Sequence, residues 1–469
     1  MNIFSFRYIL LVSTFVLYLS ILCSVLPVTV SAEESVPVDA LDVKNLGVMG
    51  NGITDDTLNI QSAIDTAYSL GKNLYFPTGT YKITGNLIPK NGVSFLGSKN
   101  DITIFDASSQ SYFVKIMDTV NEVKKVQFKN IVFINMGIHF SGKLKGEDDV
   151  LYCAFIDGKP SSSNGLEYYL NFQHGNYKIH SNVFLRGNNY PGFGITFYKS
   201  INSEVKNNYF GGIDKWDYAN PMLTSDVKSV LQKLYILYAR KNLDPAEEQG
   251  NFKTAINGIN YDQNLKIQNN FIWGNKGGLC NSAETRDHSL YIKGYTGLEI
   301  VGNYIRGWET DPSGGIKIRN GKKATVVSNY LDDHALLLYV YNNHETLELS
   351  NTFIYNNYYN SKTNYGKWGS GMSYGQNFPD SPNQKATLKN NIFYRNKFSN
   401  QNDQILFWNQ IPNQFQYRQN VYTQTNQLVK VIGNPGETDE QSILRQAPEN
   451  FSELQYIPIP LYSEGVLAP

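Results

Sequence analysis

The sequence has few of the residues that mark several common classes of protein. It contains three cysteines in 469 residues, and only Cys153 and Cys280 lie beyond position 32. Two distant cysteines do not make a disulfide scaffold, so we expect a hydrophobic core with both thiols buried in it. An excess of charge is also missing, with 41 Lys and Arg against 41 Asp and Glu. This balance excludes nucleic-acid binding through a global positive field, and it excludes an acidic disordered chain.

A long apolar run occurs at the N-terminus. Residues 1–32 carry one charge, Arg7, followed by an apolar run from Tyr8 to Leu26 and by Val30-Ser31-Ala32. This order predicts a signal peptide at residues 1–32, hence a secreted protein with no membrane attachment after cleavage. Because the run is longer than most signal sequences need, a membrane anchor that stays uncleaved is the alternative.

Helical periodicity is scarce, whereas turn formers and aromatic residues are frequent, with 38 Gly and 33 Tyr. An Asn followed by a β-branched or aromatic pair recurs, mostly at one or two units of 22 to 26 residues with insertions. The recurring residues are Asn130, Asn182, Asn208, Asn270, Asn303, Asn329, Asn351 and Asn391. A repeat of short strands with this period predicts an all-β solenoid, a parallel β-helix over residues 33–430 with a C-terminal extension at 431–469. We expect the Asn column to be a structural ladder in the turns.

Two segments depart from the strand repeat. Residues near 55–69 have helical spacing, with Leu58, Ile60, Ala63, Ile64 and Ala67 near one face, and they are expected to cap the open end of the core. An insertion at 211–258 contains a second helix candidate, 226–241. This insertion either forms a wall of a binding groove or packs on the solenoid without a role in ligand binding.

Counting back from the repeated Asn residues aligns one strand in three successive coils. Residues 290–293, 316–319 and 338–341 lie 13 to 10 positions before Asn303, Asn329 and Asn351. Alternation directs two columns inward, Leu290, Ile316 and Leu338 in one and Ile292, Ile318 and Val340 in the other. The outward residues are Tyr291, Lys317, Tyr339, Lys293, Arg319 and Tyr341, and Tyr198 extends this face by one earlier coil.

The outward residues combine aromatic rings with positive charge. Tyrosine offers a flat apolar surface to a sugar ring, and Lys and Arg offer charge to a carboxylate or sulfate. From Arg286 to Lys323, seven basic residues stand against four acidic ones. We call these outward residues (Tyr291, Lys293, Lys317, Arg319, Tyr339 and Tyr341) the basic strip, and they indicate an anionic polysaccharide as partner. The alternative is an ordinary solvent-exposed face on which the aliphatic parts of Lys and Arg pack over the tyrosine rings.

The N-terminal part of the β-helix carries a recognisable pattern. Residues 43–47, 50–57, 60–64, 74–81 and 92–97 resemble the N-terminal signature of the pectate-lyase-like superfamily, with Asn51 where the pattern has Asp. The resemblance covers residues 43 to about 107 and implies a right-handed parallel β-helix. It does not imply one reaction, since the superfamily includes lyases, hydrolases, epimerases, fructotransferases and phage tailspikes.

A weaker local similarity concerns the strip itself. Lys293 and the run 314–321 are similar to the Lys and Arg motifs of the chondroitinase B and alginate lyase family, which implies that Lys293 is the base and Arg319 the acid of a β-elimination. This sequence departs from the family at Asn320 and in a longer loop at 308–313. Arg286 and His288 replace the acidic pair that binds calcium in that family, so the cofactor stays unknown, with calcium as the open candidate.

Acidic residues and histidines in the preceding turns complete the candidate site. Asp287-His288 and Asp332-Asp333-His334 are expected to flank the strip, where His beside a carboxylate suits acid–base work. We expect a monomeric, secreted polysaccharide lyase. Its catalytic candidates are Lys293, Arg319, His288 and Asp287, and its substrate-binding candidates are Tyr198, Tyr291, Lys317, Tyr339, Tyr341 and His334. The alternatives are a glycoside hydrolase or uronate epimerase using Asp287, His288 and Asp332 or Asp333, and a non-catalytic glycan-binding surface protein.

Overall fold

The computed structural model describes most of the chain between residues 34 and 432. The described ranges are 34–118, 125–141, 147–159, 168–185, 192–212, 223–241, 252–273, 288–306, 315–332, 336–341, 346–360, 371–377, 386–407 and 415–432. The chain divides into the units Met1–Ser35 and Val36–Pro469, and all described helices and strands belong to the second unit. The predicted signal segment, Cys280 and residues 433–469 lie outside the described residues. Within the described ranges, no helix is long and apolar enough to span a membrane.

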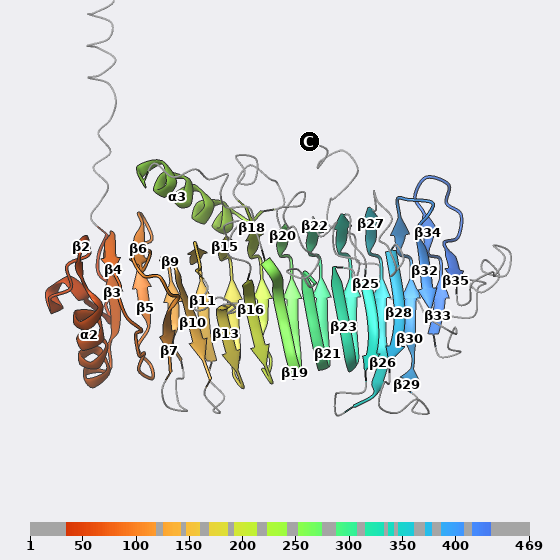
Figure 1. Cartoon of the computed structure of the whole chain (residues 1–469), viewed down its shortest axis with the longest axis horizontal. Coiled ribbons are helices and arrows are strands. Elements are labelled where there is room, and N and C mark those ends of the chain that lie inside the picture. The colour runs from red at the N-terminus through yellow and green to blue at the C-terminus, as the bar shows by residue number, and fades with distance from the viewer. Residues whose placement is uncertain are drawn as a thin grey trace, which may run out of the picture. The chain divides into compact units, whose positions relative to one another are not determined.

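Parallel strands stacked coil upon coil form two sheets (Figure 1), which contain 22 and 13 strands within the described ranges. The larger sheet consists of two rows. The first row is β7 (Val114–Met117), β10 (Met136–Phe140), β13 (Tyr168–Gln173), β16 (Gly192–Tyr198), β19 (Phe252–Gln268), β21 (Leu290–Val301), β23 (Ile316–Val327), β25 (Leu336–Tyr341), β28 (Gly371–Asn377), β32 (Gln404–Phe407) and β35 (Lys430–Ile432).

The second row shares the long strands β19, β21 and β23 with the first row, because each of these strands turns a corner and continues. Its other members are β1 (Ala40–Asp42), β3 (Asn73–Phe76), β5 (Phe95–Gly97), β8 (Gln127–Lys129), β11 (Glu147–Leu151), β14 (Asn176–His180), β17 (Glu204–Lys206), β26 (Glu348–Tyr355), β29 (Thr387–Lys389), β30 (Asn391–Tyr394) and β33 (Phe415–Arg418). The chain thus completes three straight segments in each coil, two in this sheet and one in the smaller sheet.

The smaller sheet closes each coil. It consists of β2 (Asn51–Asp55), β4 (Gly79–Lys82), β6 (Thr103–Asp106), β9 (Ile131–Ile134), β12 (Ala154–Ile156), β15 (Val183–Leu185), β18 (Tyr209–Gly211), β20 (Phe271–Trp273), β22 (Tyr304–Arg306), β24 (Tyr330–Asp332), β27 (Tyr358–Asn360), β31 (Lys397–Phe398) and β34 (Val421–Tyr422). The predicted parallel β-helix is confirmed.

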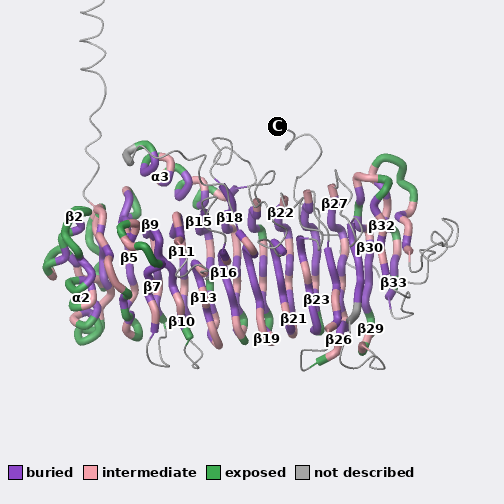
Figure 2. The backbone as a smooth tube through the Cα atoms, in the orientation of Figure 1, coloured by how far each residue is buried: buried purple, intermediate pink, exposed green. Residues whose placement is uncertain are grey.

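The core runs along the inside of the coils, where the strands are mostly buried (Figure 2). Phe133, Phe155, Phe184 and Phe210 stack in it, with successive ring centroids 4.9, 5.2 and 4.6 Å apart. Cys153 is fully buried there as predicted, and burial raises the pKa of its thiol to about 12. This thiol is therefore a packing group and not a nucleophile.

A ladder of buried asparagines joins successive coils, as the repeat predicts. In each step the backbone N and Nδ2 of one Asn donate to Oδ1 of the next, at 2.8 to 3.1 Å. The ladder contains Asn182, Asn208, Asn270, Asn303, Asn329, Asn357, Asn396 and Asn420. Each Nδ2 also donates to a backbone carbonyl of the preceding coil, so the buried amides are satisfied.

Three asparagines assigned to the ladder from the sequence do not belong to it. Asn130 and Asn351 occupy left-handed corners, with φ of 58° and 50°, and Asn391 donates instead to the carbonyl of Leu349. The left-handed residue is the one before each ladder Asn, for example Ser328 before Asn329. Asn is common at both positions because it tolerates positive φ and also bonds backbone groups, so residue type alone did not separate them.

The helix expected near residues 55–69 is α2, Thr57–Leu70, which follows the short 3₁₀ helix η1, Val43–Leu46. Its buried face consists of Thr57, Ile60, Ala63, Ile64 and Ala67. The four apolar residues of this face join the core at its N-terminal end. Leu58 was predicted on this face but is 81% exposed. Successive side chains of an α-helix differ in direction by about 100°. Leu58 follows the buried Thr57 directly, and this rotation turns its side chain away from the core.

The insertion between β18 and β19 contains α3, Ser225–Lys241, and the strand β19 begins already at Phe252. Val227, Leu231 and Leu234 of α3 belong to a second apolar cluster that also contains Val183 and Tyr209 of the smaller sheet. The described helix therefore packs on the outside of the smaller sheet. Residues 252–258, assigned to the insertion, belong to the first row, where they pair with β16 and β21 and skip one residue at Lys253.

Candidate functional site

The predicted basic strip lies on the first halves of β21, β23 and β25. Gly294, with φ of 80°, and Asn320, with φ of 44°, form the corners that end these halves of β21 and β23. Asn320 holds its corner by donating Nδ2 to the carbonyls of Tyr341 and Thr346, at 2.7 and 2.8 Å. The corners therefore separate the strip from the second half of each strand.

The register between β21 and β23 is as predicted from the sequence. Leu290 pairs with Ile316, Tyr291 with Lys317, Ile292 with Ile318, and Lys293 with Arg319. The apolar members are fully buried. The alternation thus directs Tyr291, Lys293, Lys317 and Arg319 to the outer side of the sheet.

The register predicted for β25 is wrong by two residues. Ile316 pairs with Leu336 and Ile318 with Leu338, so Arg319 lies beside Tyr339 and not beside Tyr341. The error came from Asn351, which is a corner residue, whereas the ladder Asn of this coil is Asn357. Because a shift of two keeps the side-chain alternation, Tyr339 and Tyr341 still point outward.

Tyr291 lies at the centre of the strip. Its hydroxyl accepts a hydrogen bond from Arg319 Nη1 at 2.5 Å, and Lys293 Nζ lies 4.1 Å from its ring centroid. Lys317 Nζ lies 5.2 Å from the same centroid. Three cationic side chains thus surround one phenol, which is only 6% exposed. Each cation–π contact of this kind contributes about 0.5 to 2 kcal/mol.

The two tyrosines of β25 extend the cluster on its other side. Arg319 Cζ lies 4.6 Å from the ring centroid of Tyr341, and Lys317 Nζ lies 5.0 Å from that of Tyr339. The two rings lie 6.2 Å apart and nearly parallel. The tyrosines therefore present flat apolar surface beside the cations.

His288, the described member of the Asp287-His288 pair, is also part of the cluster. Its ring meets the Tyr291 ring edge-on, with centroids 4.8 Å apart, and the residue is 1% exposed. Asp287 lies outside the described residues. The structure therefore brings together seven of the candidates, namely Lys293, Arg319, His288, Tyr291, Lys317, Tyr339 and Tyr341.

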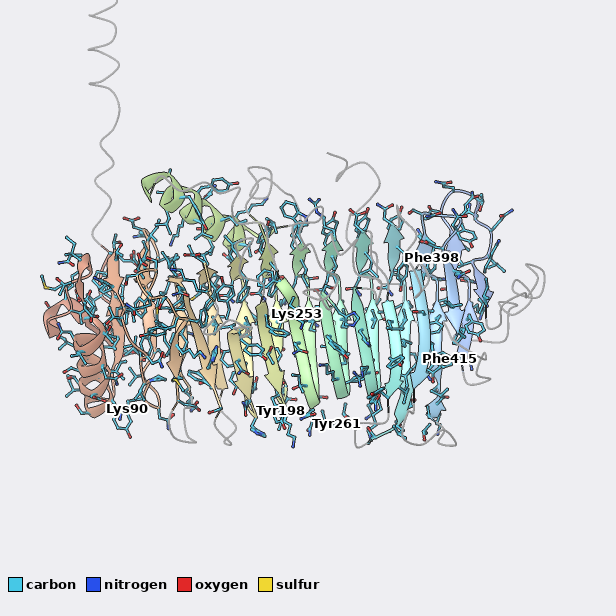
Figure 3. The ribbon with its side chains drawn as sticks, viewed as in Figure 1. Lys90, Tyr198, Lys253, Tyr261, Phe398 and Phe415 are labelled. Carbon is cyan, nitrogen blue, oxygen red and sulfur yellow. The ribbon has the colours of Figure 1, made fainter. Side chains whose placement is uncertain are left out.

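Tyr198 belongs to the same outward column, as predicted. It pairs with Ile259, which pairs with Lys293, so Tyr198 lies two strands from Lys293. Tyr198 is the last residue of β16 and is labelled in Figure 3. Ile259 was not foreseen, because its coil was assigned to the insertion. Ile259 lies one residue farther before its ladder residue, Asn270, than Lys293 lies before Asn303. The reason is the register shift between Ile259 and Asp262 in the pairing of β19 with β21.

Two polar residues of the face were not predicted from the sequence. Thr196 and Asn257 lie beside Tyr291 in one outward row, paired strand by strand. They are 4% and 3% exposed, and Thr196 Oγ1 and Asn257 Oδ1 have no hydrogen-bond partner among the described residues. Buried oxygens without partners are costly, so these groups mark the row as more than packing surface.

The acidic candidates after β24 have a different place. Asp332 is the last residue of β24 in the smaller sheet, and its Oδ1 accepts a hydrogen bond from Asn360 Nδ2 at 2.7 Å. Asp333 and His334 lie outside the described residues. Of the acid–base candidates for a hydrolase, His288 and Asp332 thus lie in different parts of the coil.

The strip does not have the donor set that calcium needs. Calcium binds six to eight oxygen ligands, mostly carboxylates and carbonyls. Among the described residues, no three His, Cys, Asp or Glu side chains gather around a common point, and the strip is occupied by Lys293, Lys317 and Arg319. We therefore derive no step through a metal ion.

Comparison with known proteins agrees with this architecture. Residues 40–215 match the family model described as "Rhamnogalacturonase A/epimerase, pectate lyase-like". The resemblance to the pectate-lyase-like superfamily is confirmed. It extends the pattern in residues 43 to about 107 by four further strands in each row of the larger sheet and four in the smaller sheet. The predicted fold class, a right-handed parallel β-helix, is confirmed with it.

Short segments of this chain also match curated proteins of Azotobacter vinelandii. Mannuronan C5-epimerase AlgE5 is 37% identical over 78 residues, which are 16% of this chain and 8% of that protein. Alginate lyase 7 is 29% identical over 138 residues, 27% of this chain and 15% of that protein. Among solved structures, the surface protein and adhesin PfbA of Streptococcus pneumoniae is 15% identical, with a TM-score of 0.49, over 84% of this chain and 99% of that chain.

Proposed function

We propose that this chain is a carbohydrate-active enzyme that cleaves a uronate-containing polysaccharide by β-elimination at the basic strip. The observation that supports the proposal is the cluster around Tyr291, in which Arg319 bonds the phenol oxygen at 2.5 Å and two lysines lie over the ring. A uronate carries a carboxylate next to the proton that must leave. A surface with three cations and an acid–base group suits that chemistry.

The roles follow from the chemistry of each side chain. Arg319 stays protonated in proteins, so it serves as a fixed cation, together with Lys317, for the substrate carboxylate. The sequence similarity had implied an acid role for Arg319. We assign that role to Tyr291, since its hydroxyl can give a proton while Arg319 stabilises the phenolate that remains.

Lys293 is the candidate base. Like charges disfavour the protonated amine, and Lys293 shares the Tyr291 ring with Lys317 and Arg319. The neutral amine removes the proton from C5 of the uronate. The C–H electron pair forms the double bond between C4 and C5, the C4–O bond breaks, and the leaving oxygen takes the proton of Tyr291.

A uronate C5-epimerase is the second candidate, and the 78-residue match to a mannuronan C5-epimerase favours it. Its first step is the same removal of the C5 proton. The two reactions differ in the next step, since an epimerase returns a proton to the opposite face of C5 and keeps the C4–O bond. Which reaction follows depends on whether an acid reaches the leaving oxygen or the other face of the ring.

One experiment separates these reactions from simple glycan binding. The full chain is incubated in D₂O with polymannuronate, polyguluronate, polygalacturonate and a neutral glucan. Ultraviolet absorbance of unsaturated ends, reducing ends and deuterium at C5 are followed together. Elimination gives unsaturated ends and reducing ends in equal amounts, and epimerisation gives deuterium without new ends.

Other results count against the proposal. Reducing ends without unsaturation identify a hydrolase, and polyuronate binding with none of the three signals identifies a non-catalytic glycan-binding protein. Elimination that survives both Lys293→Ala and Tyr291→Phe shows that the reaction takes place elsewhere on the chain.

A further inference from the structure

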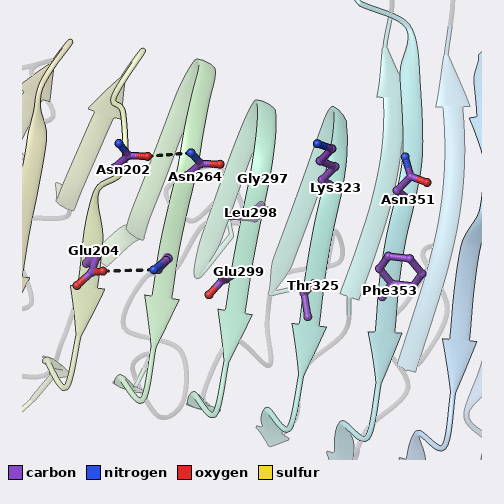
Figure 4. A pocket seen from close by; sticks show the side chains of 11 residues that line it. Asn202, Glu204, Asn264, Gly297, Leu298, Glu299, Lys323, Thr325, Asn351 and Phe353 are labelled. Atoms are coloured by element: carbon purple, nitrogen blue, oxygen red, sulfur yellow. Dashed lines mark hydrogen bonds and ion pairs between the residues drawn. The ribbon is translucent and has the colours of Figure 1, made fainter. Parts of the chain in front are cut away.

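A pocket lies beyond the corner that ends the basic strip, on the second halves of β19, β21 and β23 and on β17 and β26 (Figure 4). Its volume is about 500 Å³, within the range of about 300 to 1,000 Å³ that small-molecule sites occupy. Lys293 of the strip and Glu299 of the pocket are on the same strand, on opposite sides of the Gly294 corner. The pocket therefore faces another side of the coil than the strip does.

The floor of the pocket is a straight line of outward side chains in register. Glu204 pairs with Lys266, Lys266 with Glu299, Glu299 with Thr325, and Thr325 with Phe353. Neighbouring strands are about 4.8 Å apart, which is close to the length of one sugar residue in an extended polysaccharide. A glycan lying across the strands can thus place successive rings over successive side chains.

A missing side chain creates the hollow. At the rim, Asn202, Asn264, Gly297, Lys323 and Asn351 follow one another in left-handed conformation, with φ between 50° and 77°. Gly297 is in the middle, and a Cβ there would lie 2.4 Å from Asn264 Oδ1. Asn264 Nδ2 in turn donates to Asn202 Oδ1 at 2.8 Å, which fixes this part of the rim.

The polar groups of the pocket suit hydroxyls. Thr325 offers a hydroxyl, and the carboxylate of Glu299 also lines the pocket. Glu299 Oε2 accepts a hydrogen bond from Gln268 Nε2 at 3.0 Å, which holds this side chain in place. Phe353 is half-buried and offers a flat apolar face at one end of the line. An aromatic platform beside a few placed polar groups is the usual composition of a sugar site.

The charges of the pocket cancel, unlike those of the strip. Glu204 and Glu299 stand against Lys266 and Lys323, and Glu204 Oε1 lies 3.5 Å from Lys266 Nζ. The described strip residues are all cationic or neutral. The pocket therefore favours uncharged, hydroxyl-rich sugars, whereas the strip favours carboxylates.

We propose that this pocket is a second glycan-binding site, which holds uncharged, hydroxyl-rich sugar residues with one ring against Phe353. Such a site would hold the protein on a neutral polysaccharide while the strip meets an anionic one. The proposal concerns binding alone and does not depend on the reaction proposed for the strip.

Isothermal titration of the full chain with laminarihexaose, cellohexaose and mannohexaose tests the site. We expect at least one of the three to bind, and Phe353→Ala to weaken its binding at least tenfold. Phe353→Leu keeps apolar volume but not the flat ring, so we expect a similar loss with an unchanged midpoint of thermal unfolding. Tyr355→Ala, which removes a half-buried ring of the same strand outside the pocket, and Arg319→Lys in the strip should leave the affinity unchanged.

Three results would overturn the proposal. These are no binding of any of the three sugars, an equal loss in Phe353→Ala and Tyr355→Ala, and a loss in Arg319→Lys as large as in Phe353→Leu. The last result would assign neutral glycans to the strip. None of these results bears on whether the strip cleaves polyuronates, because the strip is tested with charged polymers.

Discussion

At the scale of single residues, neighbours decide what each side chain can do. Tyr291 is one of 33 tyrosines, and what distinguishes it is the hydrogen bond from Arg319 and the two lysines over its ring. The sequence placed it on the outward face and assigned it to substrate binding. Only the packing of the cations around the phenol indicates a part in proton transfer.

Substituting Tyr291→Phe tests that part directly. The ring and its cation–π contacts remain, but the proton donor is lost, so we expect kcat for polyuronate cleavage to fall by about 10² to 10⁴ with KM nearly unchanged. As a control, Tyr198→Phe removes a hydroxyl from the outward column that contains Lys293, two strands away from Lys293. This variant should keep kcat within about threefold of the wild-type value. Steady-state kinetics that give the two variants the same kcat would contradict the assignment.

Asp262 makes folding stability depend on pH. Its Oδ1 accepts hydrogen bonds from Ser200 N and Oγ at 2.8 and 2.9 Å, and its buried Oδ2 has no partner in the described part of the chain. Burial raises the pKa of this carboxyl group to about 7. Between pH 4 and about 7 the folded state binds the proton and the unfolded state does not, so stability from this group falls as pH rises through that window.

The variant Asp262→Asn keeps the Oδ1 acceptor and has no proton to lose. Denaturant unfolding between pH 4.5 and 7.5 should show wild type losing stability relative to the variant as pH rises, by up to about 1.4 kcal/mol per pH unit. A difference between the two proteins that is constant across this range would show that Asp262 does not titrate there.

At the scale of elements, the coils are joined by the Asn ladder, and its members determine the register. Asn357 Oδ1 accepts from both nitrogens of Asn329, at 3.0 and 2.9 Å, and Asn357 Nδ2 donates to the carbonyl of Val326. Six residues earlier, Asn351 occupies a partly exposed corner and receives one bond from Asn390. The sequence pattern around both residues is similar, but their surroundings differ.

Replacing each asparagine by alanine should reveal that difference. Asn357→Ala leaves buried donors of Asn329 without acceptors, so we expect a loss of about 2 to 4 kcal/mol in the free energy of unfolding. Asn351→Ala only places an alanine in a left-handed backbone conformation, so we expect a loss of about 1 kcal/mol in the free energy of unfolding. Denaturant titration measures both losses, and a larger loss in Asn351→Ala would contradict the ladder described here.

At the scale of the β-helix as a whole, a neutral chain carries surfaces of different charge. The total of 41 basic and 41 acidic residues hides three cations that converge on Tyr291 and a pocket whose charges cancel. Strand stacking creates this separation, because residues about 26 positions apart become neighbours while residues six positions apart on one strand face different sides. Net charge therefore predicts neither surface.

Ionic strength should distinguish the two surfaces. Binding of polyuronate at the strip should weaken severalfold between 25 and 200 mM salt, since charged contacts are screened, whereas binding of a neutral hexasaccharide should change little. In a binding titration, Lys317→Ala should reduce the salt dependence for polyuronate, and Lys397→Ala, an exposed lysine of β31, should not. An equal salt response in both variants would place the polyuronate elsewhere.

The sequence by itself determined the solenoid, the class of fold and one correct pair of neighbouring strands. It could do so because the repeated Asn, the alternation of apolar residues and the equal offsets of 290–293 and 316–319 are local properties of the chain. They fixed which of Tyr291, Lys293, Lys317 and Arg319 face outward. The helix of residues 57–70 could also be foreseen, since its apolar spacing is local too.

Only the tertiary structure decided which strands meet after an irregular coil. The shift at Ile259 and Asp262 and the corner at Asn351 change the register without changing residue type, so Asn257 was missed and Arg319 was placed beside Tyr341 and not Tyr339. The pocket beside Phe353 exists because Gly297 leaves a gap among side chains from five strands. Which residues of two distant segments meet depends on the combined length of the insertions and register shifts between them. A local sequence pattern does not contain that information.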